Sequence, residues 1–388
     1  MSCLLQHNQN IASGTALDLL LPAMPKSLNN DAAGVLPAIA GKVVKWQKVS
    51  GRNDLPWQRK RDPYHVWLSE IMLQQTQVAT VRDYFVRFLK RFPDVAALAA
   101  APMDEVLGLW SGLGYYSRAR NLHRCAAQVM ELHGGSFPPT AQLLQTLPGI
   151  GPSTAAAIAA LCFGERVAIL DGNVRRVLTR VLGFDGDLSL VANERELWRL
   201  ATELLPRRDL IQAMPRYTQG LMDLGATVCK GNATCELCPL ETLCVARRLG
   251  QQQRYPVKTR KVKRSAQSIW LLWAQALDGS IWLSKRPSPG VWGGLYCFAL
   301  FEDRAALQAA LPADYQAALL DAPALTHVLT HKDLYLHPVQ VLLPKSVRPS
   351  SEGAWFAAPE WPALGLPAPV RKLLTQVSGF PVRDGASR

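Results

Sequence analysis

The sequence lacks any apolar run of the roughly 18 residues that a membrane-spanning helix needs. It also lacks a basic segment before its first apolar stretch, which Asp18 interrupts, so the N-terminus does not resemble a secretory signal. It contains no internal repeat and no low-complexity tract. We therefore expect no membrane association and a cytoplasmic location, where thiols stay reduced and clustered cysteines suggest metal before disulfide.

Acidic side chains are scarce relative to basic ones. The 388 residues include 43 Lys and Arg but 30 Asp and Glu, for a formal net charge of +13. This excess favours a polyanion as partner, although a basic surface also occurs on proteins that bind none. With 48% hydrophobic and 19% charged residues the composition is that of a globular protein, and the length suits two or three domains of about 150 residues each.

Changes in pattern divide the chain into five segments. Apolar residues spaced by three and four indicate helices joined by short Gly- or Pro-rich turns, and short β-like runs follow a strongly basic stretch. We expect a poorly ordered N-terminal extension at 1–40, an all-α domain at 41–245, a solvated basic linker at 246–266, an α+β domain at 267–380 and a tail at 381–388.

Four of the eight cysteines lie together in the segment CKGNATCELCPLETLC. These are Cys229, Cys235, Cys238 and Cys244. Four thiolates with a C-x2-C centre, and a proline after the third, suit either a tetrahedral zinc site or an iron-sulfur cluster. The spacing alone does not choose between them.

The segment LPGIGPSTA, from residue 147, begins as a turn and continues as a helix of small residues. We expect Gly149 and Gly151 to allow positive φ, and Pro152 to occupy the first helical position. Free N–H groups at such a helix start form an anion site that a DNA phosphate would fit, with Ser153 as almost the only polar side chain. A plain helix-turn-helix corner would use small residues too.

About twenty residues further on, the segment VAILDGNVRRVLTR places Asp171 between a buried apolar run and a helix. An N-cap role would by itself account for this aspartate. Glu70 lies in another helical segment, among Trp67, Leu68 and Ile71, where removal from water would raise a carboxyl pKa.

Together these segments resemble the helix-hairpin-helix DNA glycosylases with a Gly/Pro-Asp motif, in the branch that includes endonuclease III. Three further stretches are similar to the MutY family of adenine DNA glycosylases, and the resemblance covers about residues 42–375. They are LPWQ at 55–58, VWLSEIMLQQTQVATV at 66–81 and WSGLGYYSRARNLH at 110–123. The resemblance implies an all-α helix-hairpin-helix body with an iron-sulfur loop, followed by a C-terminal α+β domain of Nudix-like fold.

The resemblance also implies an activity, namely removal of adenine mispaired with 8-oxoguanine or guanine by hydrolysis of its N-glycosidic bond. It assigns Glu70 as the acid that protonates N7 of the adenine and Asp171 as the group that stabilises the positive sugar. Asn173 and Ser153 are auxiliary site residues. Members that also cleave the strand carry a lysine at the hairpin position, so Ser153 implies little or no lyase activity.

Further residues match positions of this family that contact DNA. The adenine pocket positions are Trp57, Gln58, Leu73 and Gln219, and the intercalating or DNA-binding positions are Gln75, Tyr115, Leu147, Gly149 and Gly151. The implied partner is double-stranded DNA with A:8-oxoguanine or A:G mispairs, bound by a monomer associated with a bacterial nucleoid.

The segments WGGLYCF at 292–298 and HVLTHKDLYLH at 327–337 resemble the family's domain that reads 8-oxoguanine. The usual Phe-Ser-His of that domain is Leu329, Thr330 and His331 here, so the hydroxyl and the imidazole are kept. The cysteines imply a 4Fe-4S cluster, although the loop between Cys229 and Cys235 is one residue shorter than usual.

Three other functions compete with this interpretation. A pyrimidine-lesion glycosylase with lyase activity would carry a lysine at position 153 and would not need the domain after residue 267. A non-catalytic DNA-binding module would not need both Glu70 and Asp171. A Nudix hydrolase requires clustered glutamates after its glycines, where this chain offers only Glu302 and Asp303.

Overall fold

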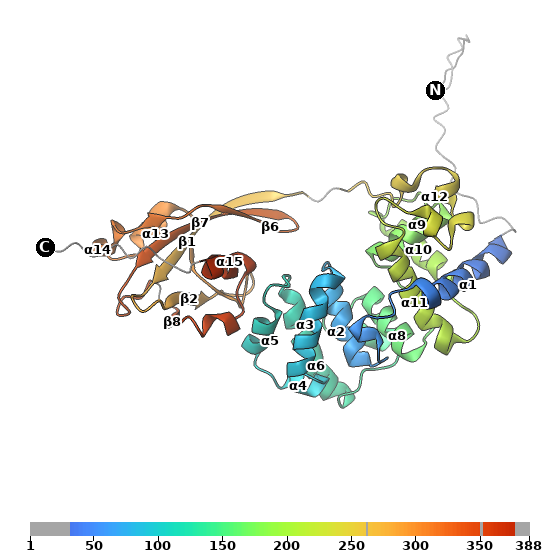
Figure 1. The fold of residues 1–388 in the computed structure, drawn as a ribbon, viewed down its shortest axis with the longest axis horizontal. Helices are drawn as coiled ribbons and strands as arrows, with labels where there is room; N and C mark the ends of the chain where they lie inside the picture. Colours follow the sequence, from blue (N-terminus) through green and yellow to red (C-terminus); the bar gives the residue numbers. More distant parts are fainter. Residues whose placement is uncertain (1–31, 261–262, 350–351, 377–388) are drawn as a thin grey trace, which may run out of the picture.

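The computed structural model describes residues 32–260, 263–349 and 352–376, and it contains a helical body followed by an α+β domain (Figure 1). The first described helix, α1, runs from Ala32 to Ser50, so the boundary expected at residue 40 falls inside a helix and is wrong. The rest of the expected extension, residues 1–31, and the expected tail at 381–388 lie outside the described residues. No described helix is long and apolar enough to cross a membrane.

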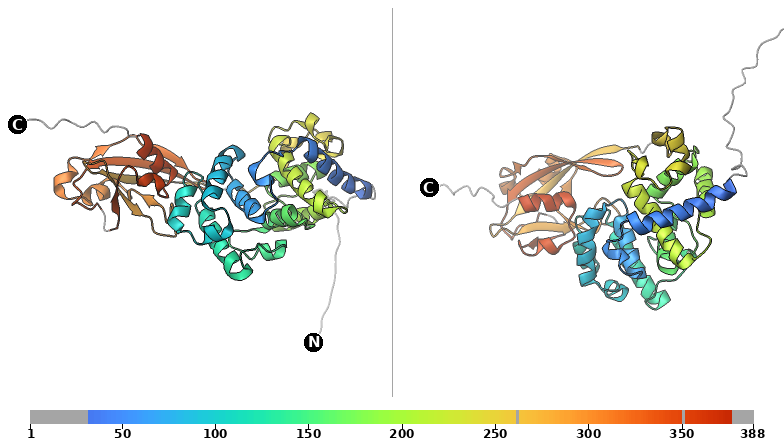
Figure 2. Two further views of the ribbon diagram at one scale, coloured as in Figure 1. Left: turned by 60° about the horizontal axis from the view of Figure 1, so that its bottom comes forward. Right: turned by 45° about the vertical axis from the view of Figure 1, so that its right-hand side comes forward.

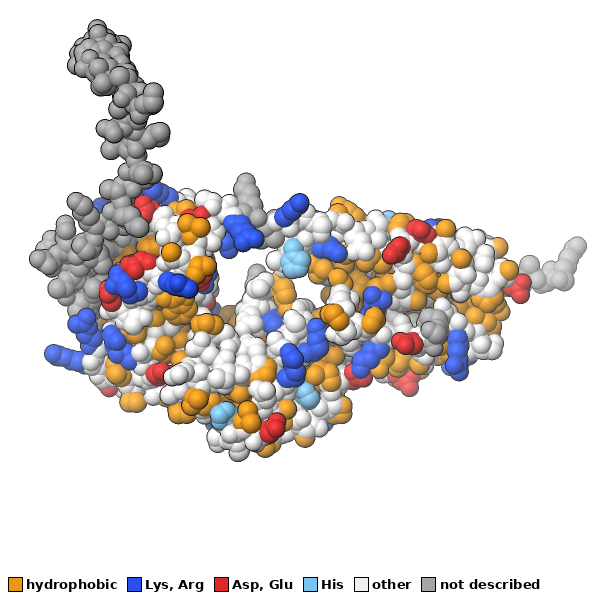
Figure 3. Space-filling model, turned by 180° about the vertical axis from the view of Figure 1, so that it is seen from behind, with side chains coloured by type: hydrophobic (Ala, Val, Ile, Leu, Met, Phe, Trp, Pro, Cys, Tyr) orange, Lys and Arg blue, Asp and Glu red, His pale blue; other side chains and the backbone are white. Residues whose placement is uncertain are grey.

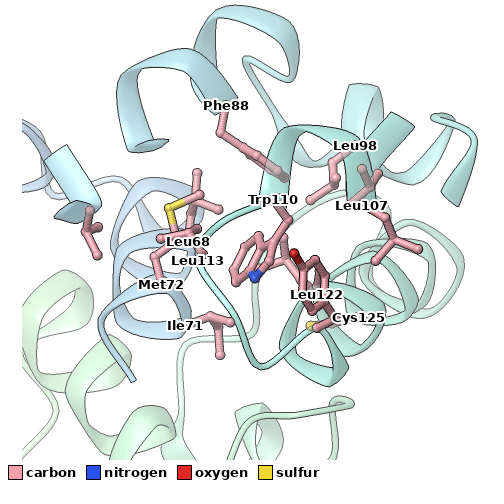
Figure 4. Close-up of a cluster of buried hydrophobic side chains, with 14 of the residues drawn as sticks. Leu68, Ile71, Met72, Phe88, Leu98, Leu107, Trp110, Leu113, Leu122 and Cys125 are labelled. Atoms are coloured by element: carbon pink, nitrogen blue, oxygen red, sulfur yellow. The ribbon is translucent and has the colours of Figure 1, made fainter. Parts of the chain in front are cut away.

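The helical body consists of two groups of helices, each with its own apolar core. The first group is α2 (Pro63–Leu73), α3 (Val78–Arg91), α4 (Val95–Ala99), α5 (Met103–Trp110), α6 (Ser117–His133), α7 (Ala141–Leu144) and α8 (Pro152–Phe163). The second group is α1, α9 (Gly172–Leu182), α10 (Val191–Glu203), α11 (Leu210–Thr227) and α12 (Val245–Arg248). In the first core the side chains of Phe88, Leu98 and Leu122 surround the fully buried Trp110 (Figure 4).

Helix α8 belongs to both cores, which explains its run of alanines. Ala155, Ile158 and Ala159 face the first core, whereas Ala156 and Ala160 face the second. A helix buried on opposite sides is apolar around its circumference, and small side chains allow neighbouring helices to approach closely. The small residues after the turn are therefore explained by packing, and only the turn itself is free to bind a ligand.

The second domain is built on one mixed sheet, whose central strands β1 and β7 run parallel with Ser265 beside Lys332. Its strands follow the order β3-β2-β1-β7-β5, while β4 pairs with β1, β6 with β7 and β8 with β2. The strands are β1 (Ser265–Gln275), β2 (Ile281–Lys285), β3 (Tyr296–Cys297), β4 (Ala299–Phe301), β5 (Leu320–Asp321), β6 (Leu325–Val328), β7 (Lys332–Leu342) and β8 (Ala354–Phe356). The helices are α13 (Arg304–Ala309), α14 (Ala313–Gln316) and α15 (Ala368–Gln376). Predictions of an all-α body and an α+β second domain are confirmed.

The segment expected to be a solvated linker is bound to the helical body over much of its length. The backbone N–H of Leu188 donates to the carbonyl of Val257 at 3.0 Å, and Asp187 accepts a short hydrogen bond from the hydroxyl of Thr259. Tyr255 is buried. These contacts hold the backbone against the body up to residue 259, while the basic side chains of Arg254, Lys258 and Arg260 stay exposed.

The second domain also packs directly on α5 and α6 (Figure 2). The Ser111 hydroxyl donates to the carbonyl of Leu366 at 2.9 Å, and the Tyr116 hydroxyl donates to the same oxygen at 2.7 Å. Arg371 Nε donates to Ser111 Oγ at 3.1 Å. Because Ser111 and Tyr116 are buried, this contact fixes the position of the second domain on the body.

Candidate active site

A cavity of about 210 Å³ opens between α1, α2 and α11. It is larger than the void of about 150 Å³ that holds benzene in another protein, so its size suits a two-ring base. Polar side chains make up most of its wall. The lining residues are Gln47, Asn53, Trp57, Gln58, Lys60, Arg61, Val66, Ser69, Glu70, Leu161, Pro215, Arg216 and Gln219.

Glu70 reaches this cavity from the C-terminal half of α2. The helix begins where Asp62 accepts a hydrogen bond from the backbone of His65 and Pro63 takes the first turn. Burial raises the pKa of Glu70 to about 7, with a smaller contribution from the negative charge of Asp171. Glu70 thus holds its proton to a higher pH than an ordinary glutamate, and Asp171 lies close enough to affect it.

Asp171 is the N-cap of α9, and its Oδ1 accepts a hydrogen bond from the backbone of Val174 at 2.7 Å. Burial raises its pKa, while hydrogen bonds to the backbone of Val174 and Asn173 act in the opposite direction. Ser153 lies beside it, because its Oγ accepts a hydrogen bond from the backbone of Leu170 at 3.1 Å. The helix after the hairpin is therefore tied directly to the segment that carries Asp171.

The hairpin turn requires glycine at one of its two positions. Gly149 has φ of +78°, and a Cβ there would lie 2.7 Å from Cβ of Asn121. Gly151 has φ of −83° and open space around it, so the expectation of positive φ at this residue is wrong. Pro152 is the first residue of α8, as predicted. Leu147 is buried, so only its backbone can meet a ligand at this turn.

Gln75 and Tyr115 are exposed non-glycine residues with positive φ, of 57° and 46°. Such conformations cost about 1–3 kcal/mol and persist where the surroundings impose them. A single buried side chain, Arg118, bonds to the residues around both of them. Its Nη1 donates to the carbonyls of Ile71, Met72 and Gln74, and its Nη2 donates to Thr76 Oγ1 and to the carbonyls of Leu113 and Gly114.

The loop between β6 and β7 reaches the same region from the second domain. Thr330 Oγ1 lies 3.1 Å from the hydroxyl of Tyr115, and the Thr330 carbonyl accepts from Arg264 at 2.9 Å. His331 is exposed, and its carbonyl accepts a hydrogen bond from the backbone of Ser265. Lys and Arg side chains gather around an opening between the two parts of the molecule (Figure 3).

Cys229, Cys235, Cys238 and Cys244 line one small cavity beside α9. Two side chains direct N–H groups toward the sulfurs, Arg180 Nη1 at 3.5 Å from Cys229 and Gln252 Nε2 at 3.6 Å from Cys235. The described residues contain no group of three or more His, Cys, Asp or Glu side chains placed to hold a metal ion. The four cysteines line one cavity, and the predicted cluster stays a prediction.

Comparison with known proteins identifies the family. The model of the HhH-GPD superfamily base excision DNA repair proteins matches residues 68–203, and that of the NUDIX domain matches residues 269–376. The adenine DNA glycosylase of Buchnera aphidicola subsp. Baizongia pistaciae is 34% identical over 348 residues, which are 87% of this chain and 96% of that protein. The chain belongs to the adenine DNA glycosylase family. It is therefore a base excision repair glycosylase that acts on adenine in DNA.

Two further comparisons agree with this assignment. The human adenine DNA glycosylase is 43% identical over 228 residues, covering 56% of this chain and 41% of the human protein. Among solved structures, that of a thermostable thymine-DNA glycosylase superimposes with a TM-score of 0.51 at 28% identity, covering 57% of this chain and 100% of that one. The helix-hairpin-helix body and the Nudix-like second domain are thus confirmed.

Three of the four residues predicted for the adenine pocket line the cavity. Trp57, Gln58 and Gln219 line the cavity with Glu70, whereas Leu73 is not among the lining residues. Trp57 is buried and packs its ring edge-on against Phe85, 5.3 Å between ring centroids.

Sequence reasoning missed several functional candidates. Arg118 lies inside the quoted GLGYYSRAR stretch, but no local pattern shows that its guanidinium spans two loops. Gln47 and Arg216 enter the cavity from helices far apart in the chain, and Arg216 Nη1 donates to Gln47 Oε1 at 3.2 Å. Only the packing of α1 against α11 brings them together.

Proposed function

We propose that the enzyme removes adenine opposite 8-oxoguanine, and also opposite guanine, by hydrolysis and without appreciable strand cleavage. The observation that carries the proposal is the acid Glu70 in the cavity wall, with a second carboxyl group, Asp171, outside the lining residues but near enough to act on it. Glu70 has a pKa of about 7, and Asp171 is close enough to raise it. Two acids in different surroundings allow one to give a proton while the other remains a base, as in glycoside hydrolysis.

Glu70 supplies the proton for the leaving base. It donates to N7 of an adenine held in the cavity, which makes the base a neutral leaving group. Its raised pKa keeps a protonated fraction available at neutral pH. Trp57 and Leu161, which line the same cavity, offer apolar surface to the purine faces.

Asp171 supplies negative charge as the deoxyribose becomes an oxocarbenium ion. Its hydrogen bond from the backbone of Val174 fixes the carboxylate in place for this role. Ser153 has no amine to attack the sugar carbon, and its hydroxyl is engaged with the backbone of Leu170. Water is thus the nucleophile, and Asn173, two residues from Asp171, is an auxiliary polar group.

The exposed loops are suited to hold the duplex open around an extruded base. Gln75 and Tyr115 enter the stack and stabilise the gap, which costs a few kcal/mol to form. The turn at Gly149 and Gly151 places backbone N–H groups at the start of α8, where a phosphate binds. Thr330 and His331 contact the 8-oxoguanine on the opposite strand. Because both parts of one chain supply these groups, a monomer suffices.

The four cysteines fit a 4Fe-4S cluster by their chemistry and by their convergence on one cavity. When bound, such a cluster would cross-link the loop from Cys229 to Cys244 and so hold the basic segment around Lys230 against the end of α9. The N–H groups of Arg180 and Gln252 would stabilise the cysteine sulfurs. Iron analysis together with absorbance near the edge of the visible range tests this assignment, and zinc or no metal would contradict it.

The decisive experiment compares duplexes that carry A:8-oxoguanine, A:G and thymine glycol, each analysed with and without alkali. We expect strand breaks from the two adenine substrates only after alkali, because base removal leaves an intact abasic strand. The A:8-oxoguanine duplex should react faster than the A:G duplex. Cleavage without alkali would contradict the absence of lyase activity, and equal rates would contradict the preference for 8-oxoguanine.

A further inference from the structure

Gln219 in the cavity wall is held by a buried carboxylate that does not itself line the cavity. Gln219 Nε2 donates to Asp223 Oδ1 at 2.8 Å, one turn along α11. Its other amide atom, Oε1, has no hydrogen-bond partner among the residues that the structure describes. The amide therefore directs its nitrogen toward Asp223, and its carbonyl oxygen is left for an occupant of the cavity.

Asp223 is itself immobilised from the other side. Its side chain is fully buried, and Arg52 donates to it twice, from Nε to Oδ1 at 2.7 Å and from the backbone N–H to Oδ2 at 2.9 Å. An ionised carboxylate only accepts hydrogen bonds, so either oxygen of Asp223 presents an acceptor to Gln219. Turning the amide over would lose a charge-assisted hydrogen bond and place two acceptors in contact.

We propose that Asp223 is a positioning residue that selects the base, because it holds the Gln219 amide with its carbonyl oxygen toward the cavity. This rests on the proposed function, in which the cavity receives the extruded base. A fixed acceptor matches the exocyclic amine of a 6-aminopurine. A 6-oxopurine such as hypoxanthine instead presents a carbonyl oxygen, which faces Gln219 Oε1 with no proton between them.

The cavity wall also offers a hydrogen-bond donor, which suits a purine because its ring nitrogens accept hydrogen bonds. Gln58 Nε2 is buried and has no hydrogen-bond partner among the described residues. Leaving a buried donor unpaired is costly, so a ligand acceptor is its expected partner. The wall thus combines one oriented acceptor, Gln219 Oε1, with one unpaired donor.

The discrimination is large enough to measure. Sites that hydrogen-bond a substrate group reject analogues that lack it, because a buried polar group is then left unpaired. In the wild-type protein the 6-amino base should be removed at least about a hundredfold faster than the 6-oxo base, a conservative figure for such sites. If the Gln219 amide is free to rotate, this ratio of rates should fall about tenfold or more, because either the amide nitrogen or the amide oxygen could then face the base.

The test measures single-turnover rates for adenine and for hypoxanthine, each placed opposite guanine and opposite 8-oxoguanine. The variants are Asp223→Asn, Gln219→Ala and the double variant, with Asp54→Asn as the matched control. Asp54 is an exposed carboxylate paired with Arg82, so its change should leave the ratio unaltered. We expect Asp223→Asn to lower the adenine-to-hypoxanthine ratio, and to have no further effect on it once Gln219 is alanine.

Two results would overturn the inference. One is an unchanged ratio in Asp223→Asn, and the other is an equal effect of Asp223→Asn with and without Gln219, which would mark a purely structural role. If Asp223→Asn does not fold, Arg52→Lys replaces it, because it keeps a cation but removes the Nε donor, and an unchanged ratio again refutes the idea. Loss of the preference for 8-oxoguanine over guanine, with the base ratio intact, would instead contradict only the proposed function.

Discussion

The hydroxyl of Tyr115 lies 3.1 Å from Oγ1 of Thr330, although 215 residues separate them in the chain. Tyr115 extends from the helical body, and Thr330 from the loop between β6 and β7 of the second domain. The contact brings a residue proposed to enter the base stack against one proposed to read 8-oxoguanine. A lesion bound there would meet both parts of the chain at once.

The first prediction concerns this contact. Replacing Thr330 with valine keeps the shape of the side chain but removes its hydroxyl. We expect the preference for 8-oxoguanine over guanine opposite adenine to fall about tenfold, the value of one hydrogen bond of ~1.4 kcal/mol. Single-turnover rates on the two duplexes measure it. The exposed Thr326→Val on β6 is the control, and an equal loss in both variants would show that the hydroxyl of Thr330 has no special role.

The second prediction concerns the pH dependence of catalysis. Because burial raises the pKa of Glu70 to about 7, the protonated acid is lost as the pH rises through this value, and the rate of base removal should fall with it. On the acid side the rate should fall again as Asp171, whose pKa is also raised, becomes protonated. Glu70→Gln should abolish removal and still bind the A:8-oxoguanine duplex. Normal turnover in that variant would refute the role of Glu70.

The same carboxyl group predicts a change in stability, which is independent of any substrate. The pKa of Glu70 is higher in the folded protein than its usual value of 4.5, so folding favours the protonated form. Its contribution to stability is full below about pH 4.5 and is lost as the pH rises through about 7. Glu70→Gln should therefore raise the free energy of unfolding at pH 8 by as much as about 3 kcal/mol and change it little at pH 4. Denaturant titrations at the two pH values measure this difference, and an equal change at both would contradict it.

The third prediction concerns Arg118, whose six hydrogen bonds hold the loops that carry Gln75 and Tyr115. Lysine cannot reproduce the planar fork of the guanidinium, so Arg118→Lys leaves several buried carbonyls unpaired. We expect the free energy of unfolding to fall by about 2–4 kcal/mol. We also expect the rate of base removal to fall, because the two loops lose their common anchor. Thermal unfolding and single-turnover rates test this. Arg124→Lys, exposed on the same helix, should be silent in both assays.

The fourth prediction compares the two hairpin glycines. Gly149→Ala places a Cβ 2.7 Å from Asn121 at positive φ, and should cost about 1–3 kcal/mol and weaken binding to undamaged duplex as well. Gly151→Ala meets open space at an ordinary φ, so stability should change by less than about 0.5 kcal/mol. Melting temperatures and duplex affinities of the two variants decide the matter. Equal effects would show that the turn geometry is not what distinguishes the two positions.

Local patterns in the sequence were sufficient for the two kinds of domain. Apolar spacing predicted the helical body and the β-like runs predicted the second domain, whereas the metal site predicted from the cysteine spacing stays a prediction. They failed where the outcome depended on distant contacts. The basic residues of the 246–266 segment predict a solvated linker, but they do not show that its backbone docks on Leu188 and Asp187, because that docking is a tertiary contact.

The sequence alone determined which candidate residues are present. A glutamate in an apolar helix, an N-cap aspartate and a serine in place of lysine are visible without coordinates. How these residues interact was decided by the tertiary structure. The raised pKa of Glu70, the orientation of Gln219 by Asp223 and the clamp of Arg118 on two loops all depend on groups that approach through packing. A pattern in sequence reports spacing along one element, whereas burial and hydrogen bonding depend on which elements meet.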